Sequence, residues 1–208
     1  DGGVHSHIDH ILALYQILTK NNIKTYIHAF LDGRDVPQKR ALDFINKNPD
    51  LNIATLSGRY FSMDRDNNWD RVKLSYNAII SGDCPNFNNA EEAINNSYAQ
   101  NITDEFIKPC KINDYLGAQD GDSLIFCNFR ADRARQISNA LINDNFNEFN
   151  RKNVNFSNKI CLTQYSQELN NFYEVIFPSQ EIKNSLGEVI AKNNLSQLRT
   201  AETEKYAH

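Results

Sequence analysis

The sequence predicts an α/β fold in which a sheet is flanked by helices. Along its 208 residues, apolar runs of strand length alternate with segments of helical periodicity. Hydrophobic residues make up 40% and charged residues 23%, which is typical of a globular domain with its own core. We therefore expect a single domain over residues 1–208.

Helical spacing of apolar side chains, together with start and stop signals, indicates several helices. Ser6 is a candidate N-cap for the first of them. The spacing of Asn88 and Glu91 is that of a capping box before another. Pro37 can open a helix, because its fixed φ suits a first turn. The predicted helices are residues 8–18, 37–45, 69–79, 88–98, 132–141 and 186–192.

Short apolar runs between these segments read as strands, and most of them end in a polar turn. The segment over residues 101–121 has no clear period, and we interpret it as a small excursion or lid. The predicted strands are residues 25–31, 52–56, 123–129 and 159–165, with a short one at 197–200.

Arginine occurs in the turns that follow the first three predicted strands. In open α/β sheets the carboxyl ends of the strands form the ligand crevice. The planar guanidinium matches both carboxylate and phosphate. We therefore expect one rim that binds a ligand carrying both groups. Its candidate residues are Arg34, Arg59, Arg65, Arg130 and Arg133.

Arg130 and Arg133 lie three residues apart where a helix is predicted to begin, so we expect them on one helical face. Free backbone N–H groups at that start would favour a phosphate. The alternative is that the arginines are solvated, or that they pair with Asp64, Asp66 and Asp132.

Asp35 directly follows Arg34, and a neighbouring cation keeps a carboxylate ionised. An ionised aspartate can accept a proton from a substrate hydroxyl as a general base. The alternative is a turn aspartate that caps the helix after Pro37.

Histidines near the start raise the question of a metal site, since imidazole is a common ligand. His5, His7 and His10 stand close together, but no second ligand set of matching spacing follows. We therefore predict no metal ligand here and a substrate contact for His5. His28 lies inside a predicted strand and is expected to be a hydrogen-bonded core histidine.

Charge and cysteine content exclude several classes of function. The net charge of −4 argues against nucleic-acid binding, and no apolar run is long enough to span a membrane. No pair among Cys84, Cys110, Cys127 and Cys161 forms a C-x-x-C motif. We expect reduced thiols and a cytoplasmic location. The chain also lacks a P-loop, a G-x-G-x-x-G, an H-E-x-x-H and a G-x-S-x-G motif.

Six stretches in this order together resemble the cofactor-independent (2,3-bisphosphoglycerate-independent) phosphoglycerate mutases. They are DGGVHSH at 1–7, HAFLDGRDV at 28–36, SGRYFSMDRD at 57–66, ITDEF at 102–106, NFRADRAR at 128–135 and AETEKYAH at 201–208. The resemblance implies the substrate-binding insert domain of an alkaline-phosphatase-like enzyme, with hinge segments at both ends. It also implies that a phosphatase-like domain absent from this chain carries the nucleophilic serine and two manganese ions.

The resemblance implies a set of substrate-binding residues, which are His5, Arg34, Asp35, Arg59, Arg65, Arg130, Arg133 and Lys205. Among these, Asp35 is the catalytic residue that moves the proton of a glycerate hydroxyl. Arg59 and Arg65 grip the carboxylate, His5 touches the phosphoglycerate, and Lys205 reaches the transferring phosphoryl group.

The remaining arginines also have implied roles. Arg34 joins the grip on the glycerate hydroxyls, whereas Arg130 and Arg133 help to clamp the substrate and the phosphoryl group. Ala131 stands where many relatives have proline, a difference without expected consequence at a helix start.

The implied activity is the interconversion of 3-phosphoglycerate and 2-phosphoglycerate in glycolysis and gluconeogenesis, through a phosphoserine. The chain lacks an initiator Met, so we expect a monomeric fragment that is inactive without its phosphatase-like partner domain. Two alternatives remain open: a stand-alone module that binds an anionic metabolite, and a related metal-dependent phosphotransferase with another substrate.

Overall fold

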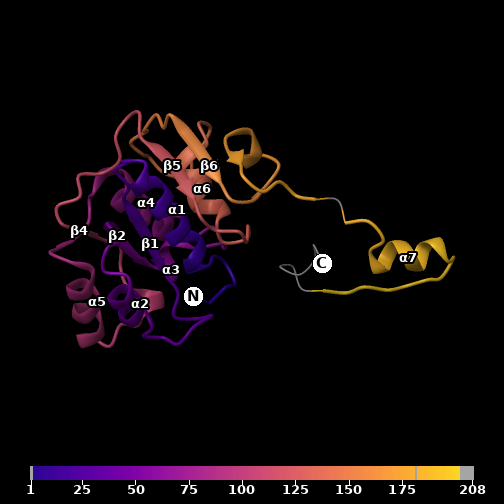
Figure 1. Cartoon of the computed structure of the whole chain (residues 1–208), viewed down its shortest axis with the longest axis horizontal. Helices are drawn as coiled ribbons and strands as arrows, with labels where there is room; N and C mark the ends of the chain where they lie inside the picture. The colour runs from indigo at the N-terminus through magenta and orange to yellow at the C-terminus, as the bar shows by residue number, and fades with distance from the viewer. Residues whose placement is uncertain (1, 181, 202–208) are drawn as a thin grey trace.

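The computed structural model describes residues 2–180 and 182–201, and it confirms the α/β class. Helices flank two sheets, one mixed and one parallel, within the main body that Figure 1 shows at the left. The alternation of strand and helix signals in the sequence therefore reflects the actual chain order, although the strands divide between two sheets.

The first sheet has the strand order β1-β2-β4-β3. Its strands are β1 (Ile27–Leu31), β2 (Ile53–Gly58), β4 (Cys110–Ile112) and β3 (Asn86–Phe87). β1 and β2 are parallel, with one register shift between Ile27 and His28, and Leu31 lies opposite Gly58. Both strands therefore end at the same edge, which brings the turns that follow them together.

The second sheet is parallel throughout and has the order β5-β6-β7. Its strands are β5 (Ser123–Phe126), β6 (Asn158–Cys161) and β7 (Glu174–Val175). β5 and β6 end earlier than their apolar runs predicted. Tyr165 donates from its hydroxyl to the backbone oxygen of Asn128 at 2.6 Å, so these segments continue as packed loops.

The described residues form seven α-helices and two short 3₁₀ turns, and all of them except α7 lie in the main body with the sheets. They are α1 (Ile8–Lys20), α2 (Ala41–Lys47), α3 (Arg59–Ser62), α4 (Trp69–Ser81), α5 (Ala90–Ala99), α6 (Arg135–Ile142), α7 (Leu186–Lys192), η1 (Asp104–Phe106) and η2 (Leu169–Asn171). The predicted helix 186–192 is confirmed, whereas the predicted strand 197–200 is wrong because that segment is irregular.

The predicted starts of α1, α4 and α7 are confirmed, whereas α2, α5 and α6 begin two to four residues later than predicted. α1 is capped by His7, whose Nδ1 accepts from the Asp9 amide at 3.2 Å, and not by Ser6. Asn89 caps α5 in place of Asn88. α2 and α6 begin later than predicted, at Ala41 and Arg135. Side-chain geometry selects among neighbouring polar residues that all have capping propensity.

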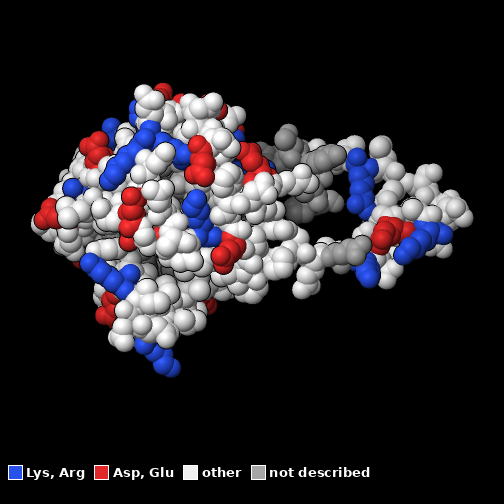
Figure 2. All heavy atoms as spheres, turned by 90° about the horizontal axis from the view of Figure 1, so that it is seen from above, with Lys and Arg blue, Asp and Glu red and all other residues white. Residues whose placement is uncertain are grey.

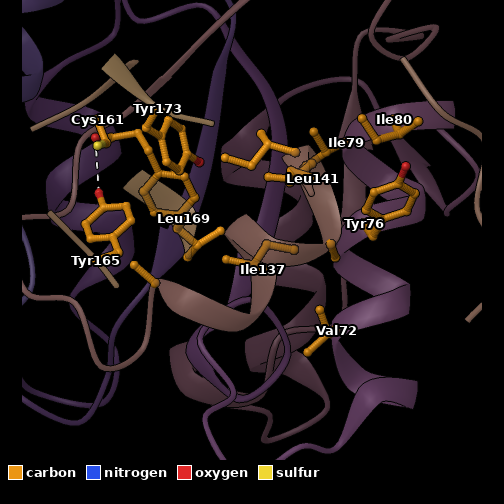
Figure 3. Close-up of a cluster of buried hydrophobic side chains, with 14 of the residues drawn as sticks. Val72, Tyr76, Ile79, Ile80, Ile137, Leu141, Cys161, Tyr165, Leu169 and Tyr173 are labelled. Atoms are coloured by element: carbon orange, nitrogen blue, oxygen red, sulfur yellow. Dashed lines mark hydrogen bonds between the residues drawn. The ribbon is translucent and has the colours of Figure 1, made fainter. Parts of the chain in front are cut away.

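Two clusters of buried apolar side chains hold the main body together. In the larger cluster α4 contributes Val72, Tyr76 and Ile79, and α6 contributes Ile137 and Leu141. Figure 3 shows these side chains between the two helices. The smaller cluster joins α2 and α5 to the first sheet.

α7 lies apart from the main body, at the right of Figure 1. None of its residues is buried. Its segment leaves large apolar side chains in solvent, including Leu186 at 69%, Leu195 at 65% and Leu198 at 90% exposure. Large apolar residues that are exposed together are a feature of surfaces that another part of a protein, or another protein, covers.

One face of the main body is mixed in charge. On the face seen in Figure 2, basic and acidic side chains are interspersed over the main body. Within the described residues, no helix has the length and apolar character needed to cross a membrane.

His28 on β1 generates a prediction about pH dependence. Its Nδ1 lies 2.9 Å from the hydroxyl of Thr55 on β2, as expected for a hydrogen-bonded core histidine. Burial lowers the pKa of His28 from 6.5 to about 4. Between these two pKa values His28 is protonated in the unfolded chain but not in the folded chain. The stability of the folded state therefore falls as the pH drops from 6.5 towards 4.

We expect acidification from about pH 7 to about pH 5 to remove about 2 kcal/mol of unfolding free energy through His28. Urea unfolding across that range measures it, with His28→Gln as the matched variant that cannot titrate. His5 titrates in the same window in both proteins, so the variant should still lose some stability, but the wild type should lose more because only it carries His28. Equal losses in the two proteins would contradict the prediction.

Candidate functional site

Arg59 is the centre of the candidate site. It is the first residue of α3, directly after β2, and is only 4% exposed. Its Nη1 donates to Asp32 Oδ1 at 2.8 Å and to Asp35 Oδ2. Its Nη2 lies 3.2 Å from His5 Nε2. The parallel register of β1 and β2 explains this meeting, because it places residues 32–35 beside the start of α3.

The electrostatics keep Arg59 and Asp32 ionised. Burial alone would lower the pKa of Arg59, but hydrogen bonds to Asp35 and Asp32 outweigh it and raise the pKa. Burial would raise the pKa of Asp32, but backbone N–H donors of Asp35 and Arg34, together with Arg59, lower it. The buried Arg59 cation is thus stabilised by two carboxylates, one of which, that of Asp32, is itself fixed by backbone donors.

Asp132, in the loop between β5 and α6, forms a second centre. Its Oδ1 lies 3.1 Å from Arg130 Nε and 3.6 Å from His5 Nδ1, and its Oδ2 lies 3.2 Å from Arg65 Nη1. Burial would raise the pKa of Asp132, but Arg130, His5 and Arg65 outweigh it and lower the pKa. Sequence reasoning treated Asp132 as a possible partner for arginine, not as an organising residue.

His5 connects the two centres. Its backbone oxygen accepts from the Phe129 amide at 2.9 Å, which ties the start of the chain to the loop after β5. Burial, and then the charge of Arg59, lower the pKa of His5 to about 4. The ring is therefore neutral near neutral pH. Among the described residues, its buried Nδ1 has no hydrogen-bond partner.

Arg133 adds a half-buried cation to this edge. Its Nη1 donates to the backbone oxygen of Met63 at 2.8 Å, and its Nε has no hydrogen-bond partner within residues 2–180 and 182–201. Burial, followed by the charges of Arg59 and Arg65, lowers the pKa of Arg133. Such concentrated positive charge favours an anionic ligand.

The prediction that Arg130 and Arg133 share a face at a helix start is wrong. Both residues lie in the loop before Arg135, where α6 begins. They still approach the same site, because the ion pair with Asp132 and the hydrogen bond to Met63 direct them there. Loop contacts, and not helical periodicity, therefore set their positions.

Arg34 is placed differently from the other arginines. It is 61% exposed, and its Nη1 lies 3.6 Å from Glu105 Oε1. The cation bonded to the Asp35 carboxylate is Arg59, not the adjacent Arg34 that we expected. Asp35 also does not cap α2, since Asp104 accepts from the first amides of that helix.

Two further sequence expectations concern Lys205 and the histidines near the start. Lys205 falls outside the described residues. The rings of His7 and His10 lie tilted to each other with 5.7 Å between their centroids, and His7 caps α1. In the described part of the chain, no group of three or more His, Cys, Asp or Glu side chains could hold a metal ion.

Taken together, these residues form an edge rich in arginine, with acidic groups beside the cations. The guanidinium groups come from α3, the α3–α4 loop and the β5–α6 loop, and they can grip carboxylate or phosphate. Asp35 remains 24% exposed beside Arg59, where it can accept a proton from a bound hydroxyl.

Residues 1–167 match the family described as "BPG-independent PGAM N-terminus (iPGM_N)". The chain belongs to this family. It is 48% identical, over its whole length, to a 2,3-bisphosphoglycerate-independent phosphoglycerate mutase of Rhodopseudomonas palustris, of which it covers 42%. It is also 47% identical to 2,3-bisphosphoglycerate-independent phosphoglycerate mutase 1 of Methanosarcina barkeri, of which it covers 42%.

A solved relative confirms the fold. The crystal structure of Leishmania mexicana phosphoglycerate mutase at low cobalt concentration matches with a TM-score of 0.79 and 27% identity. The match covers 93% of this chain and 39% of that one. The chain thus spans about two fifths of the length of these phosphoglycerate mutases.

The buried Arg59 cluster generates a stability prediction. Replacing Arg59 with Leu leaves Asp32 and Asp35 without their cation, which should cost about 2 kcal/mol of unfolding free energy. The figure is below that for a fully buried pair because both carboxylates are partly exposed. Urea unfolding measures the loss, and the exposed Arg199→Leu serves as a control expected to change little. Equal stability of the two variants would contradict a buried ionic centre.

Proposed function

We propose that this chain is the substrate-binding part of a cofactor-independent phosphoglycerate mutase that interconverts 3-phosphoglycerate and 2-phosphoglycerate. The observation that carries the proposal is the convergence of Arg59, Arg65, Arg130 and Arg133 on one edge, in a chain of this family. The ligand has a carboxylate and a phosphate, which are the groups that guanidinium forks bind best.

In this proposal the arginines divide the anionic groups of the ligand between them. Arg59 and Arg65 hold the carboxylate, while Arg130 and Arg133 clamp the side that carries the phosphoryl group. Contacts with the rest of the chain hold the buried Arg59 and the half-buried Arg133 in place, so little ordering of these side chains remains on binding. A firm grip keeps glycerate bound between loss and return of the phosphoryl group.

Asp35 is the proposed proton carrier. The hydroxyl that receives the phosphoryl group gives up a proton, and the oxygen that loses the group takes one up. Asp35 can hold that proton between the two events. Its position next to Arg59 supports this role, because the arginine binds the same carboxylate oxygen that lies 3.5 Å from His5 Nε2.

His5 is proposed to contact the substrate as a neutral imidazole. A pKa of about 4 keeps it uncharged near neutral pH, so it can donate or accept a hydrogen bond without a counter-ion. Its buried Nδ1 without a hydrogen-bond partner among the described residues supports this contact. Arg34 and Lys205 complete the proposed binding set, the former on the glycerate hydroxyls and the latter on the phosphoryl group.

The proposed metal ions belong to the rest of a longer polypeptide. Two manganese ions would supply charge stabilisation for phosphoryl transfer. The described residues offer no ligand group for them, so they are assigned to a phosphatase-like domain outside this chain. The exposed apolar side chains around α7 support such a partner. We propose hinge segments at both ends, a cytoplasmic monomer, and no role in membrane or nucleic-acid binding.

Arg59→Ala in the longer enzyme tests the function. We expect kcat/KM for 3-phosphoglycerate to fall by about a hundredfold or more, because a bidentate anion contact is lost and the Asp35 site is disturbed. A coupled assay of 2-phosphoglycerate formation measures it. Lys47→Ala, an exposed cation at the end of α2, is the control and should be unchanged. Normal kinetics in the Arg59 variant would refute the assignment.

The chain alone should bind weakly and not turn over substrate. Calorimetric titration with 3-phosphoglycerate, with and without manganese, should give the same affinity, because the proposed metal site lies elsewhere. Turnover by the isolated chain in a parallel assay would show that the catalytic machinery had been misplaced.

A further inference from the structure

The 3₁₀ turn η1 packs against two glycines, Gly33 in the turn after β1 and Gly58 at the end of β2. Gly33 has φ +70°, and a Cβ there would lie 2.9 Å from the Glu105 amide nitrogen. A Cβ at Gly58 would overlap the backbone oxygen of Glu105. Both glycines are thus required by the close approach of η1. Since Gly33 precedes Arg34 and Gly58 precedes Arg59, η1 contacts the backbone that carries both arginines.

Hydrogen bonds lock η1 in that place. The Gly58 amide donates to Ile107 O at 2.7 Å, and the Asp104 amide donates to Gln38 O at 3.0 Å. The first of these ties the end of β2 to the end of η1. The second ties the loop that follows β1 to the beginning of η1. The turn therefore joins the two segments that deliver the site residues.

The Asp104 side chain is the anchor of η1. It is 1% exposed. Its Oδ2 accepts from the amides of Arg40 and Ala41 at 2.7 and 2.9 Å, so it caps α2 from a distant part of the chain. Its Oδ1 accepts from the hydroxyl of Tyr98 on α5 at 2.5 Å. A buried carboxylate with this many donors holds its backbone firmly.

Glu105 extends from this anchored turn towards the site. Its Oε1 lies 3.6 Å from Arg34 Nη1, and its side chain is 17% exposed against 61% for Arg34. A long exposed arginine loses considerable rotamer freedom when it binds a ligand. An ion pair with a better-buried carboxylate on a fixed turn reduces that loss, because it limits the orientations of Arg34 beforehand.

We propose that the η1 turn is a positioning device for Arg34, in which Asp104 fixes the turn and Glu105 orients the guanidinium. Glu105 is a positioning residue and touches no reacting atom. The inference rests on the proposed function, since Arg34 must contact the substrate for its orientation to matter. It adds residues 104 and 105 to a site otherwise built from the strand-end loops.

The test is a double-mutant cycle between Glu105 and Arg34 in the longer enzyme. We expect Glu105→Gln to lower kcat/KM for 3-phosphoglycerate by about twofold to tenfold, mainly through a higher KM. In an Arg34→Ala background the same change should have no further effect. Glu91→Gln, an exposed glutamate in the first turn of α5, is the matched control and should leave both constants unchanged.

The outcomes separate this inference from the proposed function. If Arg34→Ala alone leaves the kinetics unchanged, the assignment of Arg34 to the substrate fails. If Arg34→Ala is impaired but Glu105→Gln is normal, or binds substrate more tightly, the positioning role is overturned. An equal effect of Glu105→Gln in both backgrounds also overturns it, because Glu105 would then act without Arg34.

Tyr98→Phe tests the anchoring half of the proposal without removing the Asp104 carboxylate. We expect KM to rise about twofold, because one hydrogen bond to the Asp104 carboxylate is lost. This increase should disappear in the Arg34→Ala background. A lower melting temperature with unchanged KM would reduce Asp104 to a structural residue and overturn its positioning role.

Discussion

The site depends on a buried guanidinium. Arg59 can occupy a position that is 4% exposed because Asp32 and Asp35 neutralise it, and their carboxylates in turn accept from the backbone or from Arg59 itself. An unpaired charge at this depth would carry a large desolvation cost. The carboxylates and the arginine come from different strand ends, so the ion pairs also lock the edge where β1 and β2 finish.

A second carboxylate repeats this arrangement on the other sheet. Asp132 gathers Arg65, Arg130 and His5 from separate segments, and His5 links it to Arg59. The two sheets therefore contribute to one continuous polar network, in which the neutral His5 ring joins two groups of ion pairs. Acidic groups keep several cations close together in the absence of an anionic ligand, which would otherwise be needed to offset their repulsion.

Sequence reasoning located most of the strand-end residues because the rule behind it is geometric: parallel strands end at one edge, and their turns meet there. It erred where the answer depended on side-chain direction. Arg34 turns to Glu105 instead of its neighbour Asp35, and Arg130 lies before the helix and not on it. It also missed β4 and η1, since elements of three residues carry no period to detect.

The sequence by itself determined the fold class, the helices with strong periodicity, the family resemblance and the list of candidate residues, because these depend on local pattern and composition. The tertiary structure decided which carboxylate pairs with which arginine, that His5 is neutral, and that Asp104 caps α2 across the chain. Pairing and pKa depend on distances between residues remote in sequence and on burial. Neither quantity exists until the sheets and loops have packed.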